Sequence, residues 1–333
     1  MAMEFLPKFL KSQFLVSVPV PDTSCAGKTI IVTGSNTGLG KEAARHFARL
    51  GASTVILAVR SETKGGAAKE DIEASLPRDS KTDIQVWHLD MASYDSVKAF
   101  AARADGLPRL DAVVLNAGIQ TLEYVLAEGE ESTITVNVVA TFLLAVLLLP
   151  VLERTAKTTG GKTNLAVLSS DLLYVAPLKE RKTTTWEKEG VFAAMREKEK
   201  GMDGMSRYMD SKLMDAYAAR ELAGLKPVER GVVINYLTPG WCKSELSREQ
   251  DTMAVRAVTS VMARSTEVGS RTLVHGATAG EETHGQFLMD SQITVPGGLV
   301  KGEEGKALQE KVWKELRTKL ETIEPKVATI LNA

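Results

Sequence analysis

The sequence predicts an α/β fold, with one doubly wound sheet of about seven parallel strands and helices on both faces. Short apolar runs rich in β-branched residues alternate along the 333-residue chain with longer helical patterns. This alternation is typical of parallel strands joined by right-handed helical crossovers. The strand runs also lack polar alternation, which indicates burial on both faces of the sheet. No repeat or low-complexity linker interrupts the pattern, so we expect one domain over residues 27–300.

The strands and helices follow in order along the chain. The expected strands are 28–34, 53–59, 83–90, 110–118, 163–170, 231–240 and 285–290. The expected helices between them cover 40–51, 66–75, 95–104 and a long stretch at 131–154. Residues 301–333 contain the amphipathic run ALQEKVWKELRTKLETIEP, which predicts a C-terminal helix that packs on the same domain.

Three segments need a separate interpretation. Residues 1–26 are apolar but interrupted by Pro7, Lys8 and Lys11, so we expect a packing segment; binding to a membrane surface is the alternative. The apolar run 142–152 is too short to span a bilayer and predicts a buried helix, either under the sheet or at a subunit interface. Residues 171–207 form a long polar insertion, which predicts a substrate lid.

Composition excludes several classes of protein. A net charge of -1 without a basic stripe argues against nucleic-acid binding. Cys25 and Cys242 are the only cysteines, which excludes a disulfide framework and favours a reducing, cytoplasmic compartment. The four histidines lack metal-ligand spacing, so we expect no metal site.

The segment TGSNTGLG, residues 33–40, ends the first strand and opens the first helix. Its glycines, Gly34, Gly38 and Gly40, allow a tight turn whose backbone N–H groups approach a pyrophosphate at the helix N-terminus. A glycine-rich turn alone is a weak signal, but the strand before it and the helix after it supply the required context. The turn therefore predicts a dinucleotide site.

The end of the second strand indicates which dinucleotide binds. An NAD-binding chain usually has an acidic residue there, which binds the ribose 2′-hydroxyl. This chain has Val59 at that position, followed by Arg60. An arginine suits a 2′-phosphate through charge-assisted hydrogen bonds, so NADP(H) is favoured over NAD(H).

Further motifs follow in an order that resembles the short-chain dehydrogenase/reductase family. They are TGSNTGLG, HLDMAS around Asp90, LNAG at 115–118, TVNVVATF around Asn137, VLSSD around Ser170, RYMDSK with Tyr208 and Lys212, and PGWCKSEL from Pro239. The resemblance covers about residues 27–325 and is nearest to the retinol-dehydrogenase-like branch, particularly fungal ketoreductases of secondary metabolism. Leu115 departs from the family's Asn-Asn-Ala-Gly signature.

The resemblance implies a Rossmann-type fold, an NADP(H)-dependent oxidoreductase and a set of site residues. Asn137, Ser170, Tyr208 and Lys212 match the family's catalytic tetrad. The implied cofactor-binding residues are Gly34, Ser35, Asn36, Thr37, Gly38, Leu39, Gly40, Arg60, Asp90, Asn116, Ala117, Gly118, Tyr208, Lys212, Pro239, Gly240 and Ser244.

By the same analogy each member of the tetrad has a role. Tyr208 protonates the developing alkoxide, and Lys212 lowers the pKa of the phenol and holds the nicotinamide ribose. Ser170 binds the substrate carbonyl, and Asn137 supports proton relay. A free phenol titrates near pH ~10, so Tyr208 needs such an environment to act at neutral pH.

The substrate and the class of reaction stay open. The implied substrate is a medium-to-large, partly apolar carbonyl compound or alcohol of polyketide or terpenoid type, with a retinoid-like aldehyde second. A non-catalytic NADP-binding protein and a dehydratase, epimerase or isomerase are the alternatives. Ser169 could replace Ser170, Asp171 could point away from the site, and a homodimer could form through the long helix. Cys242 lacks a histidine partner and is expected to pack. The expected lid contacts are Leu172, Leu173, Tyr174, Trp186, Phe192, Met195, Met202 and Met205.

Overall fold

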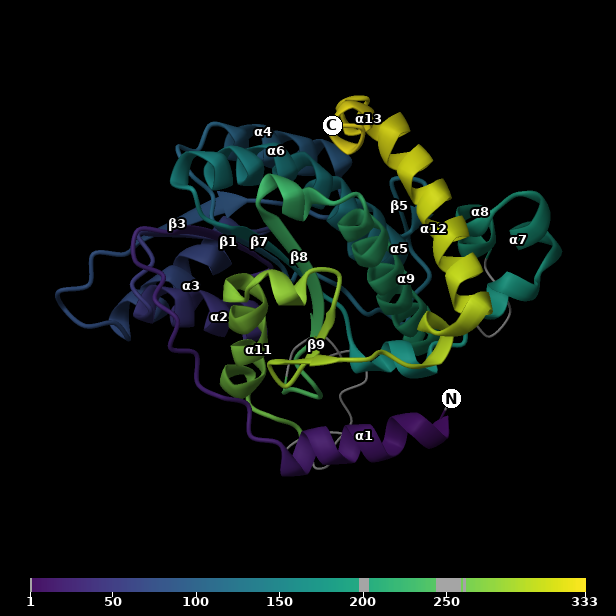
Figure 1. The fold of residues 1–333 in the computed structure, drawn as a ribbon, viewed down its shortest axis with the longest axis horizontal. Helices are drawn as coiled ribbons and strands as arrows, with labels where there is room; N and C mark the ends of the chain where they lie inside the picture. Colours follow the sequence, from purple (N-terminus) through teal and green to yellow (C-terminus); the bar gives the residue numbers. More distant parts are fainter. Residues whose placement is uncertain (1, 198–203, 244–258, 260–261) are drawn as a thin grey trace.

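The computed structural model describes residues 2–197, 204–243, 259 and 262–333. An eight-stranded sheet forms its centre, with helices on both faces (Figure 1). The strand order is β10-β9-β8-β7-β4-β1-β2-β3. The strands are β1 (Thr29–Thr33), β2 (Thr54–Val59), β3 (Asp83–His88), β4 (Ala112–Leu115), β7 (Thr163–Leu168), β8 (Val232–Thr238), β9 (Phe287–Met289) and β10 (Gln292–Thr294). The expected mainly parallel, doubly wound α/β fold is confirmed.

The register of the sheet places its central strands side by side. Ile31 of β1 lies opposite Ile56 of β2 on one side and Val113 of β4 on the other, both in parallel pairing. The order changes direction between β1 and β4, because β2 and β3 follow on one side and β7 to β9 on the other. Ligands of such sheets bind at this crossover point, beyond the carboxyl ends of the strands.

The eighth strand was not expected from the sequence. β10 pairs antiparallel with β9, with Gln292 opposite Met289. The two-residue turn between them is formed by Asp290 and Ser291, with φ of 56° and 60°. Tight hairpin turns of this kind usually contain glycine or asparagine, so this pair gave no recognisable hairpin signal.

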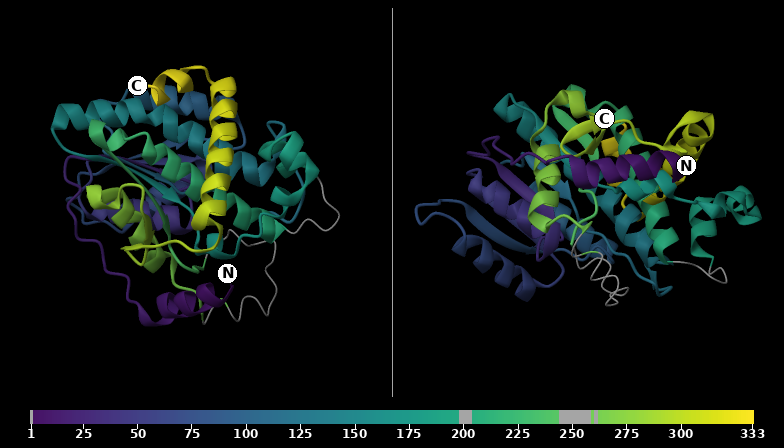
Figure 2. Two further views of the ribbon diagram at one scale, coloured as in Figure 1. Left: turned by 45° about the vertical axis from the view of Figure 1, so that its right-hand side comes forward. Right: turned by 90° about the horizontal axis from the view of Figure 1, so that it is seen from below.

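Two groups of helices enclose the sheet. One face is covered by α2 (Gly38–Arg49), α3 (Glu62–Ala74) and α11 (Thr266–Thr278). The other is covered by α4 (Tyr94–Asp105), α6 (Thr141–Thr159) and α9 (Gly204–Gly224). Outside this second group, α12 (Gly302–Ile323) packs on α9 and α13 (Lys326–Leu331) packs on α6 (Figures 1 and 2).

The long helix expected at 131–154 is not regular. It begins as α5 (Ser132–Ile134), continues as the π-helical segment η1 (Thr135–Ala140), and then becomes α6. A π-helical segment inside an α-helix is rare and is frequent at functional sites. Within the described chain, the stretch Ser132–Thr159 is long and apolar enough to cross a bilayer, but 89% of its most apolar window is buried inside the fold. Burial in the protein therefore accounts for its apolar character, as expected for the run 142–152.

The insertion at 171–207 is folded where it is described. It contains η2 (Asp171–Val175), η3 (Lys179–Lys182), α7 (Thr184–Lys188) and α8 (Val191–Arg196), with α7 and α8 beside α12 (Figure 2). Five of its expected substrate contacts instead belong to the hydrophobic core: Leu173, Tyr174, Trp186, Phe192 and Met195. That expectation was wrong for these residues, because large apolar side chains gain more from burial in the core than from an open pocket. Met202 lies outside the described residues.

The remaining elements are short. The hairpin β5 (Leu126–Ala127) and β6 (Glu130–Glu131) forms a separate two-stranded sheet. Among the residues that the structure describes, the later 3₁₀ turns are η4 (Pro227–Arg230), η6 (Glu281–Thr283) and η7 (Gly298–Val300).

The N-terminal helix α1 (Ala2–Leu15) packs on the segment that follows β8. The Gln13 side chain donates hydrogen bonds to the carbonyl oxygens of Trp241 (2.9 Å) and Met262 (2.7 Å). Ser12 Oγ donates to Asp290 (2.9 Å), which also forms a buried ion pair with Arg264 (2.7 Å). The N-terminal segment thus covers the edge of the sheet where the candidate site lies.

Candidate functional site

The candidate residues meet because the parallel strands end at one edge of the sheet. The glycine-rich turn follows β1, Arg60 follows β2, Asn116 follows β4 and Ser170 follows β7. Helix α9 carries Tyr208 and Lys212 across the same edge. The site therefore combines side chains that are far apart in the sequence.

The turn after β1 requires its glycines. Gly34 has a φ of 65°, and a Cβ there would lie 3.0 Å from Ala117 Cα. A Cβ on Gly40 would lie 2.6 Å from the Gly34 carbonyl oxygen and from Asn116 Nδ2. Gly38, with a φ of 60°, faces open space at the start of α2. Of the other residues in this turn, Ser35 donates its hydroxyl to Val32 O (2.8 Å) and is fully buried, so its side chain holds the turn in shape.

Asn116 connects the turn to the neighbouring strand. Its side-chain amide donates to Thr33 O (2.8 Å) and Gly34 O (3.2 Å). The backbone N–H groups of Asn116 and Ala117 both donate to Thr33 Oγ1, at 2.9 Å. These bonds fix the ends of β1 and β4 relative to each other.

Val59, Arg60 and Asp90 lie beyond the turn. The side chain of Val59 is buried under α3, where a Cβ on Gly65 would come within 2.7 Å of it. Arg60 is exposed, and its side chain forms no ion pair with any residue in the described ranges. Asp90 Oδ1 accepts the N–H of Ala92 (2.9 Å), which holds this carboxylate at the end of β3.

Tyr208 and Ser170 are in direct contact. Tyr208 is buried, which raises the pKa of its phenol, and the neighbouring Ser170 side chain partly opposes that rise. Ser170 Oγ also accepts the N–H of Leu172 (3.1 Å), which fixes the serine at the start of η2. Ser169 instead donates to the Lys212 backbone carbonyl (2.8 Å), so its hydroxyl faces α9. Of the two serines, Ser170 is the one whose hydroxyl meets the phenol.

Asp171 does not point away from the site. Its carboxylate accepts from Ser170 Oγ (3.3 Å) and is buried, and burial raises its pKa to about 6. No pattern in the sequence indicated an acidic group beside the phenol. Its backbone N–H donates to Thr238 Oγ1 (3.1 Å), which explains the inward orientation.

Lys212 is held by two acceptors. Its Nζ donates to the carbonyl oxygen of Leu168 (2.8 Å) and to Asp215 Oδ2 (2.9 Å). The same Nζ lies 5.8 Å from the centre of the Tyr208 ring. The sequence did not identify Asp215, although its position three residues after Lys212 on a helix places it on the same face.

The pKa of Tyr208 in this structure is raised, whereas Lys212 was expected to lower it. Burial is the main cause, followed by the negative charges of Asp215 and Asp171. The Lys212 ammonium does not offset this rise, because it is paired with the Asp215 carboxylate.

Asn137 joins three parts of the site. Its Oδ1 accepts the N–H of Ile119 (2.8 Å), and its Nδ2 donates to Ile119 O (3.0 Å) and Ser211 Oγ (2.9 Å). Ser211 in turn donates to Tyr208 O (2.7 Å). A Cβ on Gly118 would lie 3.2 Å from Asn137 Oδ1, so this glycine allows close approach. Asn137 and Ser211 thus connect β4, η1 and α9.

The segment after β8 is only partly described. Gly240 has a φ of 74° and donates its N–H to Thr238 Oγ1 (3.2 Å). Pro239 O accepts from Cys242 Sγ (3.4 Å), and burial raises the pKa of that thiol to about 12, so Cys242 packs and is not poised as a nucleophile. Ser244, expected to bind the nicotinamide amide, lies outside the described residues.

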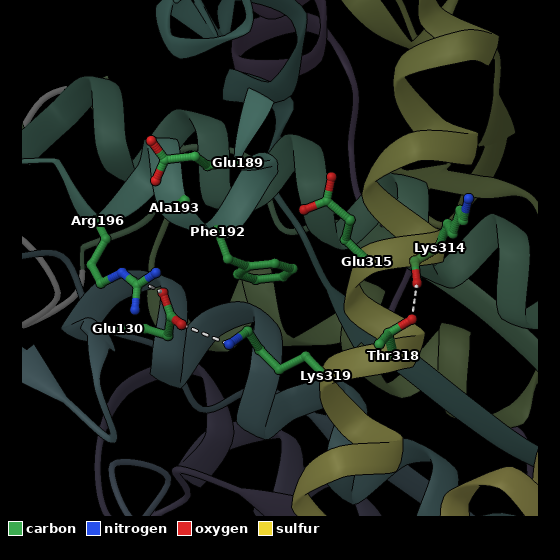
Figure 3. Close-up of a pocket in the computed structure, with 9 residues that line it drawn as sticks. All are labelled: Glu130, Glu189, Phe192, Ala193, Arg196, Lys314, Glu315, Thr318 and Lys319. Atoms are coloured by element: carbon green, nitrogen blue, oxygen red, sulfur yellow. Dashed lines mark hydrogen bonds and ion pairs between the residues drawn. The ribbon is translucent and has the colours of Figure 1, made fainter. Parts of the chain in front are cut away.

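A surface pocket elsewhere is not this site. It has a volume of about 360 Å³ and lies between α8 and α12 (Figure 3). Its lining includes Phe192, Lys319 and Glu130, and the last two form an ion pair (2.6 Å). None of the candidate site residues lines it. Within the described ranges, no cluster of three or more His, Cys, Asp and Glu side chains is arranged to hold a metal.

Comparison with known proteins agrees with this geometry. A family model described as short chain dehydrogenase matches residues 28–169. The chain is 45% identical, over 96% of its length and 99% of the relative, to the short chain dehydrogenase/reductase dmxR8 of Cryptosporiopsis sp.. It is 39% identical to the short-chain dehydrogenase anuD of Penicillium roqueforti, over 97% of this chain and 85% of that protein.

Solved structures share the fold. An uncharacterised protein from Mycobacterium paratuberculosis is 25% identical, with a TM-score of 0.61 and coverage of 90% of this chain and 95% of that one. The Pseudomonas aeruginosa RhlG/NADP active-site complex is 23% identical, with a TM-score of 0.60, over 80% of this chain and 96% of that one. The latter similarity concerns the fold alone.

Proposed function

Since this chain belongs to the short-chain dehydrogenase/reductase family, we propose that it is an NADPH-dependent oxidoreductase that interconverts a carbonyl group and an alcohol. The observation that carries the proposal is the contact between Tyr208 and Ser170, with Lys212 beside the phenol, at the edge of the sheet where the glycine-rich turn opens. All four tetrad positions carry the residue types that the family uses for catalysis. This argues against a protein that binds the cofactor without catalysing a reaction.

The residues at this edge fit a dinucleotide. A pyrophosphate fits at the start of α2, because there is space at Gly38 and the chain approaches closely at Gly34 and Gly40. The backbone N–H groups and the helix dipole at this end of α2 favour an anion. Arg60 is available for a 2′-phosphate, and Lys212 for ribose hydroxyls. When bound, the nicotinamide supplies or accepts the hydride.

The chain's own residues would manage the proton and the carbonyl. Ser170 donates a hydrogen bond to the substrate oxygen, and the Tyr208 O–H transfers its proton to that oxygen as carbonyl becomes alcohol. In the oxidative direction Tyr208 takes the proton back. Asn137 holds Ile119 and Ser211 in place around the phenol and thereby maintains its orientation.

We further propose a medium-to-large, partly apolar substrate of polyketide or terpenoid type. Leu172, next to Ser170, and Met205, in the first turn of α9, are half-buried apolar residues near the catalytic side chains. The similarity to the short-chain dehydrogenases of Cryptosporiopsis and Penicillium supports the redox reaction itself. We also propose that the protein works in the cytosol as a homodimer. Sedimentation at several protein concentrations tests the dimer.

The test is oxidation of NADPH, with NADH in parallel, against a panel of apolar ketones and aldehydes. Turnover with NADPH should fall about 10²- to 10⁴-fold in Tyr208→Phe, the usual contribution of general acid–base catalysis. Tyr217→Phe is the matched control, because Tyr217 is a buried tyrosine on the same helix whose hydroxyl donates to Leu299 O (2.7 Å).

The outcomes separate the candidate activities. Deuterium transferred from labelled NADPH into an alcohol product, with activity kept in Tyr217→Phe, supports the reductase. Product formation without deuterium would indicate a dehydratase, epimerase or isomerase on this scaffold. Full activity in Tyr208→Phe, or failure to bind either dinucleotide, would refute the proposal.

A further inference from the structure

A buried carboxylate lies directly behind the Lys212 ammonium. Asp215 is fully buried on α9, and its Oδ2 accepts from Lys212 Nζ at 2.9 Å. The Leu168 carbonyl oxygen accepts from the same nitrogen at 2.8 Å. An ammonium has three N–H donors, so one stays available for a ligand. Gly118 leaves room on that side, since a Cβ there would lie 3.7 Å from Nζ.

This arrangement also changes the electrostatics at the phenol. Nζ lies 5.8 Å from the Tyr208 ring centre and 2.9 Å from Asp215 Oδ2, so the carboxylate is within about 9 Å of the ring. Burial raises the pKa of Asp215 to about 6, and the ion pair with Lys212 at 2.9 Å favours its ionised form. The pair therefore presents little net positive charge to Tyr208.

Besides Asp215, one other charged group shifts the pKa of the Tyr208 phenol. Asp171 of η2 adds a second negative influence and raises the pKa of Tyr208. Asp171 itself interacts with Arg264 and Asp290, which form their own buried ion pair at 2.7 Å.

We propose that Asp215 is a positioning residue, which fixes Lys212 Nζ and offsets its charge so that Tyr208 stays a protonated phenol, the form needed to reduce a carbonyl. The inference rests on the proposed function of Tyr208. Asp215 would thereby favour carbonyl reduction over alcohol oxidation near neutral pH. Oxidation would be favoured only in alkaline solution.

The test removes the negative charge of Asp215 and keeps the shape of its side chain. In Asp215→Asn, the phenolate absorbance of Tyr208 should appear about 1.4 pH units lower, the shift given by one charge at about 9 Å in a medium of dielectric constant about 20. The absorbance is obtained by subtracting the titration of the same chain carrying Tyr208→Phe. Titrations with and without NADP⁺ bring the transition into range, because the cationic nicotinamide favours the phenolate.

Three further variants control the measurement. Asp215→Glu keeps the charge and should keep the native titration. Asp215→Ser is a second neutral variant, which should shift like Asp215→Asn if the latter folds poorly. Asp210→Asn removes another buried carboxylate from α9, one that accepts the N–H of Leu178 (2.7 Å), and should leave the Tyr208 titration unchanged.

The kinetic measurement uses the best ketone and its alcohol. In Asp215→Asn the alkaline limb of alcohol oxidation should move down by the same pH interval, and the ratio of reduction to oxidation at neutral pH should fall. A Tyr208 transition that stays in place or moves up in both neutral variants would overturn the inference. The absorbance titration needs no substrate, so a chain that shifts as expected but lacks turnover would contradict the proposed function and leave the role of Asp215 standing.

Discussion

Arg60 offers the sharpest test of cofactor preference. It follows β2 directly, and its side chain is exposed at the edge where the strands end. Val59 before it is buried under α3 and has no carboxylate to bind a ribose hydroxyl. We therefore expect Arg60→Ala to reduce catalysis with NADPH selectively.

The magnitude follows from the contact that is removed. Hydrogen bonds to charged groups contribute about 1.5–3 kcal/mol, equivalent to about 10- to 150-fold in affinity. Arg60 is exposed, so solvent and salt screen its charge over about 8 Å at physiological ionic strength. We expect the lower end, a loss of about tenfold in kcat/KM for NADPH at that ionic strength and a larger loss at low salt.

The assay measures kcat/KM for NADPH and NADH at several salt concentrations with one ketone. The change with NADH should stay below about twofold, because NADH lacks the 2′-phosphate. Lys157→Ala, which removes an exposed cation on α6, controls for the general charge of the protein. Equal losses with both cofactors, or no loss with NADPH, would refute the role of Arg60.

Two further predictions concern stability. In α3, Gly66→Ala should stabilise by about 0.8–1 kcal/mol through helix propensity, since nothing lies within 4 Å of its Cβ position. Gly65→Ala should destabilise the protein by up to about 2 kcal/mol, because its Cβ would approach Val86 at 2.6 Å and Val59 at 2.7 Å, and overpacking exceeds the propensity gain. Changes of the same sign in the free energy of unfolding of both variants, measured in urea, would contradict this reasoning. Burial raises the pKa of Asp210 from 3.8 to about 8, so its contribution to stability is present below about pH 4 and is lost as pH rises through about 8. Asp210→Asn should therefore gain at least about 1.4 kcal/mol relative to the native chain between pH 4 and pH 8, and an unchanged difference would exclude a buried, protonated Asp210.

Local patterns in the sequence predicted much of the fold. Apolar runs such as KTIIVTG and STVILAV became β1 and β2, because strands buried on both faces require continuous β-branched side chains. The turn at 33–40 was recognisable because its glycines must adopt a positive φ or allow close backbone approach. β10 was missed because Asp290 and Ser291 adopt positive φ without glycine.

The sequence could predict which residues of the candidate site share a helix face. Tyr208 and Lys212 are four apart on one helix, a spacing that places both on the same face. The sequence could not decide between Ser169 and Ser170, because successive residues after a strand point in opposite directions. The hydrogen bond from Ser169 to Lys212 O and the contact of Ser170 with Tyr208 decide that question in the fold.

The sequence by itself determined the order of strands and helices, the glycine-rich turn and the helix that carries Tyr208 and Lys212, because each depends on residues near one another in the chain. The tertiary structure alone decided which groups surround them. Asp171 approaches the phenol from η2, and the apolar side chains of the insertion enter the core, through contacts between separate elements. Burial and ion pairing depend on those contacts, so the protonation state of Tyr208 is a property of the folded molecule.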